Sequence, residues 1–208
     1  MDLVRRMMLW LLTQPVLTTI TFRHLGCVID RAAWEAVRVA ISDNRILIEP
    51  AGLSAISGYN AERDTFCMQP SLFTVAAYFP SDCATAAHEL AHAAADMQAI
   101  AALSSADSEL IAYVTEEAFR LRQGLPNDGP GVLNVGAPPL TQAWRSPLHD
   151  ALVAARSLAS FVLAHPGASL QAPTVAIVRD ALGRDPTYRR QFAENTVTSN
   201  GLRRPIVS

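Results

Sequence analysis

Hydrophobic and polar positions along the first seventy residues follow two periods, which predict both strands and a helix. β-branched and aromatic residues over 16–22 and the apolar stretch 45–49 before Pro50 are typical of strands. Between them, apolar residues at helical spacing predict a helix that begins after Asp30 as its N-cap. Two extended runs flank residues 60–64, which favour a turn and so predict a β-hairpin.

The rest of the chain has the pattern of helices. No Gly or Pro interrupts 81–104, so we expect a long helix there, with Ser81 or Asp82 as its cap. A second helix is expected after Asp107, its N-cap, and before Gly124. Residues 124–143 are expected to form a loop, and 144–208 a helical part that begins with Pro147 after Ser146. The fold class is therefore α+β, with a single domain over 1–208 and its core over 16–123.

The N-terminal segment has two alternative interpretations. Two arginines followed by an apolar run are similar to a secretory signal, but that run is shorter than the roughly 7–15 residues of a signal peptide. A short docked helix, capped by Asp2 and presenting Leu3, Met7, Trp10 and Leu11 on one face, is the preferred interpretation. No stretch reaches the roughly 18 apolar residues of a membrane span.

Composition and charge exclude some classes of function. Half of the 208 residues are apolar and the net charge is −2, with no basic stripe, so we expect a globular protein and no nucleic-acid partner. The three cysteines are far apart and odd in number, so free thiols are expected rather than a disulfide scaffold or a cysteine-built zinc site.

The segment "HELAH" carries the chemistry. His88 and His92 lie one helical turn apart, about 40° around the axis, so both imidazoles can bind one ion. Glu89 lies beside them, where its carboxylate can take a proton from water that zinc has acidified toward a pKa of about 7. This HExxH arrangement is typical of zinc metallopeptidases. The alternative is an alanine-rich helix with two incidental histidines.

A third ligand is needed from farther along the chain. The extension HExxHxxGxxH is excluded, because Ala95 and Gln98 stand at the required Gly and His positions. Glu109 on the next predicted helix is the preferred third ligand, and Asp107 is the second choice. Asp96 lies one turn beyond the histidines, too far for the same ion, so a supporting role is expected for it.

Taken together, "HELAH" and the downstream "SELIAYVTEE" resemble the gluzincin branch of the zincin metallopeptidases, including compact bacterial toxin or effector peptidases. The segment "ISGYNAERDTFCM" is similar to the hairpin before their active-site helix, whose edge strand pairs with extended peptide substrate. The resemblance covers roughly residues 16–124. It implies a zincin-like fold, a small twisted sheet packed on the HExxH helix, with 16–123 as the catalytic core.

The resemblance also implies a site and a function. His88, His92 and Glu109 would bind Zn²⁺, and Glu89 would be the general base in hydrolysis of a protein or peptide substrate. Gluzincins have a further Tyr or His that stabilises the oxyanion, and three residues remain open for that role: Tyr113, His149 and Tyr188. Such a protein would be cytoplasmic in the producing cell or exported by a dedicated secretion system. The alternative function is a zincin-like zinc-binding module that binds proteins without cleaving them.

Overall fold

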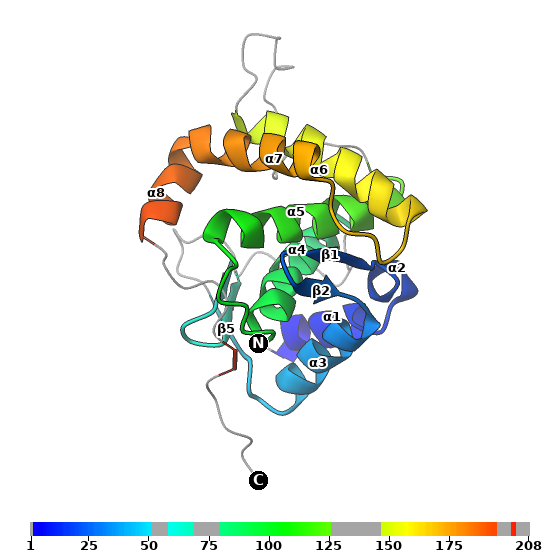
Figure 1. Ribbon diagram of the computed structural model, residues 1–208. Coiled ribbons are helices and arrows are strands. Elements are labelled where there is room, and N and C mark those ends of the chain that lie inside the picture. Colours follow the sequence, from blue (N-terminus) through cyan, green and yellow to red (C-terminus); the bar gives the residue numbers. More distant parts are fainter. Residues whose placement is uncertain (1, 51–57, 69–79, 126–146, 195–200, 203–208) are drawn as a thin grey trace, which may run out of the picture.

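The computed structural model describes residues 2–50, 58–68, 80–125, 147–194 and 201–202 (Figure 1). In the described residues the strands all lie before residue 69 and helices follow them, so the α+β class with a mainly helical C-terminal part is confirmed. No helix in the described ranges is long and apolar enough to cross a membrane. The elements are α1 (Asp2–Leu11), α2 (Pro15–Thr18), β1 (Phe22–His24), β2 (Cys27–Ile29), α3 (Arg31–Ser42), β3 (Leu47–Pro50), β4 (Gly58–Asn60), β5 (Thr65–Met68), α4 (Pro80–Asp96), α5 (Ser105–Arg122), α6 (Pro147–Ala164), α7 (Ala172–Arg184) and α8 (Pro186–Glu194).

The predicted strand over 16–22 is wrong. Pro15 occupies the first turn of the short helix α2, and the hydroxyls of Thr18 and Thr19 donate back to the carbonyls of Gln14 and Pro15. Proline favours that first turn, and hydroxyl bonds to the preceding turn stabilise a local bend in place of a strand. Only Phe22 of the predicted strand lies in β1, which pairs with β2 as an antiparallel hairpin.

The predicted strand before Pro50 and the predicted hairpin are confirmed. β5 lies in the middle of a three-stranded sheet, parallel to β3 and antiparallel to β4. Tyr59 of β4 is opposite Phe66 of β5, and their rings contact each other. In the part of the sheet that the structure describes, β4 is therefore an edge strand.

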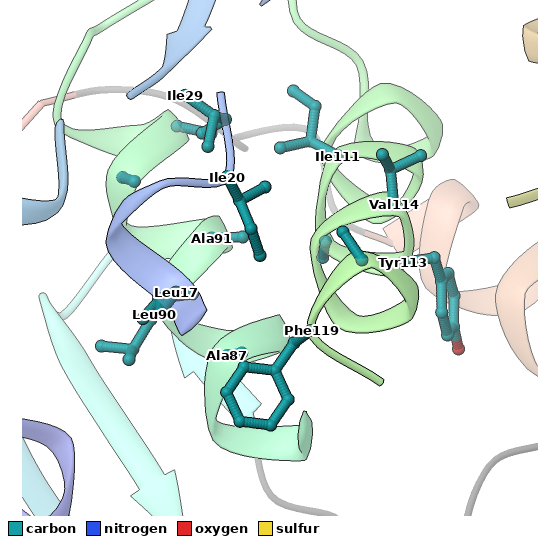
Figure 2. Packing of buried hydrophobic residues seen from close by; sticks show 14 of the residues in the cluster. Leu17, Ile20, Ile29, Ala87, Leu90, Ala91, Ile111, Tyr113, Val114 and Phe119 are labelled. Carbon is teal, nitrogen blue, oxygen red and sulfur yellow. The ribbon is translucent and has the colours of Figure 1, made fainter. Parts of the chain in front are cut away.

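The centre of the molecule is the pair α4 and α5. Alanines line α4, among them Ala87 and Ala91, which are completely buried. Because these side chains are small, they leave room for α5 to approach α4 closely, and Ala112 of α5 is completely buried as well. Figure 2 shows the two helices, with Ala87 and Ala91 labelled on α4 and Ile111 and Val114 on α5. Helices α6 and α7 cover the other side of α5, which is buried over nearly its whole length (Figure 1). This packing fixes the position of α5 relative to α4.

Helix α1 forms as predicted, but the predicted apolar face is partly wrong. Leu3 and Trp10 are about two-fifths exposed, while Val4, Met8 and Leu11 are buried beside Met7. The buried stripe is thus rotated relative to the prediction. The sequence offers apolar side chains on both sides of this helix, so its composition alone does not determine the buried side.

The predicted long helix over 81–104 begins and ends elsewhere. It begins at Pro80, so Asp82 lies inside its first turn, and it ends at Asp96. After the helix, Ala99 adopts a left-handed backbone with φ 51°. The Gln98 amide accepts from the Val28 backbone N–H at 2.9 Å and donates to the Val28 carbonyl at 3.0 Å. These bonds to β2 stabilise the chain reversal, which leaves 97–104 as a connection.

The predicted helices after Asp30, before Gly124 and from Pro147 agree with the structure. Asp30 caps α3 by accepting from the Ala33 backbone N–H at 2.9 Å, and Gly124 follows α5 with a φ of 66°. Pro147 begins α6, and two short helices, α7 and α8, follow. Most of the predicted loop over 124–143 and the predicted cap Ser146 lie outside the described residues.

Candidate metal centre

The packing of α5 on α4 brings the three predicted metal ligands together. His88 and His92 lie one turn apart on α4, and their Nε2 atoms are 3.2 Å from each other. Oε2 of Glu109, on α5, lies 3.5 Å from Nε2 of His88 and 3.7 Å from Nε2 of His92. Within the described residues this is a group of side chains that could hold a metal ion.

The spacing of these atoms suits zinc. Atoms bound tetrahedrally to zinc at 2.0–2.1 Å lie about 3.3 Å from one another, close to the three separations above. Two imidazoles and one carboxylate are also a donor set that zinc accepts in catalytic sites, with a fourth position left open. His88 and Glu109 are less than a tenth exposed, so the site is largely shielded from water.

The charges around the site favour a cation. Burial lowers the pKa of His92 to about 4, which keeps its imidazole neutral, as a metal ligand must be. Burial opposes a charge on His88 too, but hydrogen bonds with Glu109 and Glu116 outweigh it and raise its pKa well above the ordinary value. The carboxylates of Glu109 and Glu116 thus favour a positive charge at this position, and a divalent ion would supply it.

Each histidine is oriented by a contact at its other ring nitrogen. Nδ1 of His92 lies 2.8 Å from the Ser108 hydroxyl, and Nδ1 of His88 lies 3.1 Å from the Glu116 carboxylate. The Arg120 guanidinium donates to the other oxygen of Glu116 at 3.1 Å. Such partners fix the ring orientation of a ligand, so we expect the Glu116–Arg120 pair to position the His88 ring.

Glu89 lies beside the ligand group and is held by the edge strand. Its Oε2 accepts from the Tyr59 backbone N–H of β4 at 2.7 Å. Burial raises the pKa of Glu89 to about 7, although the His88 charge and the Tyr59 bond act in the opposite direction. A carboxylate with a pKa near neutrality can both accept and return a proton.

Two of the three candidate oxyanion residues meet next to His88. The rings of Tyr113 and His88 are in edge-on contact, with 4.6 Å between their centroids. The hydroxyl of Tyr113 is hydrogen bonded to the hydroxyl of Tyr188 from α8. In Figure 2, Tyr113 and Ile111 project from different sides of α5. Burial, and then the nearby charge of Glu109, raises the pKa of Tyr188, so its hydroxyl stays protonated. His149, the third candidate, is exposed on α6.

Asp107 and Asp96, the two aspartates near the predicted site in the sequence, contact residues other than the metal ligands. Asp107 is not the N-cap of α5: Ser104 is, and Asp107 completes a capping box from the third helical position. Its Oδ1 lies 2.9 Å from Nε2 of His24, so it is not the third ligand either. Asp96 is fully buried and accepts from the Tyr59 hydroxyl at 2.8 Å. It therefore supports the strand that holds Glu89.

In comparisons with protein-family models, with curated proteins and with solved structures, nothing matches this chain. The chemistry that the centre can perform therefore follows from its own geometry. That geometry defines a His/His/Glu group that could hold a metal, with Glu89 adjacent to it.

Replacing Glu116 with Gln tests the positioning role. We expect the zinc affinity to fall about 10–100-fold, since the contact with Nδ1 of His88 would lose its charge. Glu117→Gln is the matched control, because Glu117 pairs closely with Arg156 at 2.9 Å, lies as far as 4.0 Å from Arg120 and contacts no ligand. Zinc affinity is measured by competition with a chelating dye. Equal affinities in both variants would contradict this role for Glu116.

Proposed function

We propose that this protein is a zinc-dependent metallopeptidase of the gluzincin type, with a zincin-like catalytic core. The observation that carries the proposal is the set of separations from 3.2 to 3.7 Å among His88, His92 and Glu109, together with the buried carboxylate of Glu89 beside them. A zinc ion bound there would polarise a peptide carbonyl and acidify water.

In this proposal Glu89 moves the proton. Its buried carboxylate would take a proton from the attacking water and then give it to the leaving amine. The Tyr59 backbone N–H, at 2.7 Å, orients the carboxylate. The Tyr59 hydroxyl donates to Asp96, and this hydrogen bond holds β4 in place. Tyr59 is therefore fixed through its side chain while its backbone orients Glu89.

The edge strand β4 suggests where the substrate lies. The Tyr59 N–H points to Glu89 and therefore away from β5, toward the open side of the sheet. An extended peptide added along that edge would pass directly next to Glu89. This is the arrangement that cleavage of an unfolded protein segment or a peptide requires.

The pair of tyrosines is our candidate for stabilising the oxyanion. Tyr113 is fixed by its contact with His88, and its hydrogen bond with Tyr188 holds the second hydroxyl near the same ring. A protonated hydroxyl there can donate to an oxygen that becomes negative during the reaction. We assign this donation to Tyr188 and the positioning of its hydroxyl to Tyr113.

Tyr188→Phe tests this assignment. We expect kcat to fall about 10²–10³-fold, as for removal of one oxyanion donor, with little change in KM. Tyr113→Phe should have a smaller effect, because it removes only the partner of the donor. Steady-state kinetics of both variants give the comparison, and an unchanged kcat in Tyr188→Phe would remove Tyr188 from the mechanism.

The function itself is tested by incubating the zinc-loaded protein with a mixture of unstructured peptides and identifying products by mass spectrometry. We expect new termini that disappear when a zinc chelator is added. If zinc is bound stoichiometrically and no peptide in the mixture is cut, the alternative of a zinc-binding module without peptidase activity replaces the proposal.

A further inference from the structure

A pocket of about 470 Å³ lies between the β1–β2 hairpin and α7, and no metal ligand lines it. Its base is fixed by backbone hydrogen bonds between the hairpin and the α6–α7 connection. The Arg23 N–H donates to the Ala168 carbonyl at 3.0 Å, and the Arg23 carbonyl accepts from the Leu170 N–H at 3.0 Å. The volume is in the range of about 300–1,000 Å³ that small-molecule sites occupy.

The lining of this pocket is mostly apolar. Val28 of β2, Leu170 of the connection and Val175 of α7 contribute to its walls. Leu25, at the turn of the hairpin, also lines it and is 51% exposed. A positive φ at Leu25 (48°) and at Gly26 (88°) makes this tight turn. A leucine exposed at the edge of a pocket provides an apolar contact for a ligand.

Two arginines give the pocket a positive charge. Arg23 and Arg179 both line it, and no ion pair of Arg23 occurs within the described ranges. Arg179 lies 3.6 Å from the Asp107 carboxylate, and its side chain is 47% exposed. That carboxylate is already bonded to His24 at 2.9 Å and to Ser104. Asp107 thus pairs with Arg179 and His24 and not with Arg23 in the described residues, so the guanidinium group of Arg23 adds an unbalanced positive charge to the pocket.

We propose that this pocket binds a small organic anion, a carboxylate attached to an apolar body. The carboxylate pairs with the guanidinium groups of Arg23 and Arg179, and the apolar body fills the space against Val28, Leu170 and Val175. Guanidinium groups bind carboxylates through paired hydrogen bonds, and the apolar walls favour a ligand with one charge over a small hydrated anion. This inference does not rest on the proposed function.

The test measures the binding of octanoate, used as the probe, to the full chain by isothermal titration calorimetry. We expect octanoate to bind with a dissociation constant on the order of 1 mM or below. Octanamide has nearly the same shape without the charge, and we expect it to bind at least about 10-fold more weakly. Equal binding of the two compounds, or no binding of octanoate, would overturn the proposal.

Variants locate the binding. Arg23→Gln and Arg179→Gln should each weaken octanoate binding about 10-fold or more. Arg184→Gln is the matched control, since Arg184 is also exposed on α7 but pairs with Asp180 outside the pocket. Ala176→Trp should block binding by filling the pocket.

Folding and metal content are controlled separately. Circular dichroism checks the fold of each variant. Arg179→Gln removes a partner of Asp107 and could perturb it. If it does, the result for Arg23→Gln decides whether the pocket binds octanoate. Octanoate binding that is the same in the wild type, Arg23→Gln and Ala176→Trp would place the ligand elsewhere and overturn the assignment. Zinc content should be unchanged in all these variants, so failure of this proposal is distinguishable from failure of the metal centre.

Discussion

Glu89→Gln is expected to lower kcat for peptide hydrolysis by about 10²–10⁴-fold, the usual contribution of a general acid or base. The amide oxygen of Gln can still accept the Tyr59 N–H, which donates to Glu89 at 2.7 Å, so the local structure should be kept. An amide cannot take a proton at neutral pH, and the proton transfer is therefore lost. Rates on the peptide identified in the library experiment, with zinc content measured on the same samples, test this.

The control for this variant is Glu35→Gln. Glu35 is exposed on α3, where it pairs with a neighbouring arginine on the same helix, Arg38, so activity should be unchanged. We expect Glu89→Gln to retain about as much zinc as the wild type, because Glu89 is not a ligand. Hydrolysis at the wild-type rate by zinc-loaded Glu89→Gln would rule out Glu89 as the base.

Glu109→Gln is expected to weaken zinc binding by more than about 100-fold, because even changes to groups that only orient ligands cost roughly 10–100-fold. Glu109 supplies the carboxylate of the group, with its Oε2 at 3.5 Å from His88 and 3.7 Å from His92. A neutral amide oxygen is a poor zinc ligand, and it also removes a negative charge that balances the ion. Competition with a chelating dye measures the affinity.

A matched control exists on the same helix. Glu117 is buried like Glu109, but it pairs with Arg156, so Glu117→Gln should bind zinc as tightly as the wild type. Circular dichroism of both variants checks that α5 remains folded. If Glu109→Gln bound zinc as tightly as Glu117→Gln, Glu109 would not be a ligand.

The sequence predicted the fold well where local signals and tertiary packing agree. The hairpin around residues 60–64 and the helix after Asp30 form as expected, because turn-forming residues and an N-cap act over a few residues. The strand over 16–22 failed because Pro15 and two threonine hydroxyls favour a helical turn over the β-branched pattern. The end of α4 was missed because a bond from Gln98 to β2 determines it.

The site was predictable to the extent that its residues share one helix or adjacent helices. His88 and His92 follow from spacing, and Glu109 follows from the next helix, since short connections place neighbouring helices in contact. The partners of these residues were harder to find. The contact of Ser108 with His92 and that of Tyr59 with Glu89 depend on helix rotation and strand position, which no local pattern encodes.

The metal content of the protein tests whether His88, His92 and Glu109 bind one zinc ion. The protein is exposed to zinc, dialysed to remove loosely bound metal and analysed by mass spectrometry. We expect about one equivalent of zinc per chain in the wild type and less than about a tenth in His88→Ala, which loses one of three ligands. Less than a tenth of an equivalent in the folded wild type, or equal zinc in both proteins, would contradict this expectation.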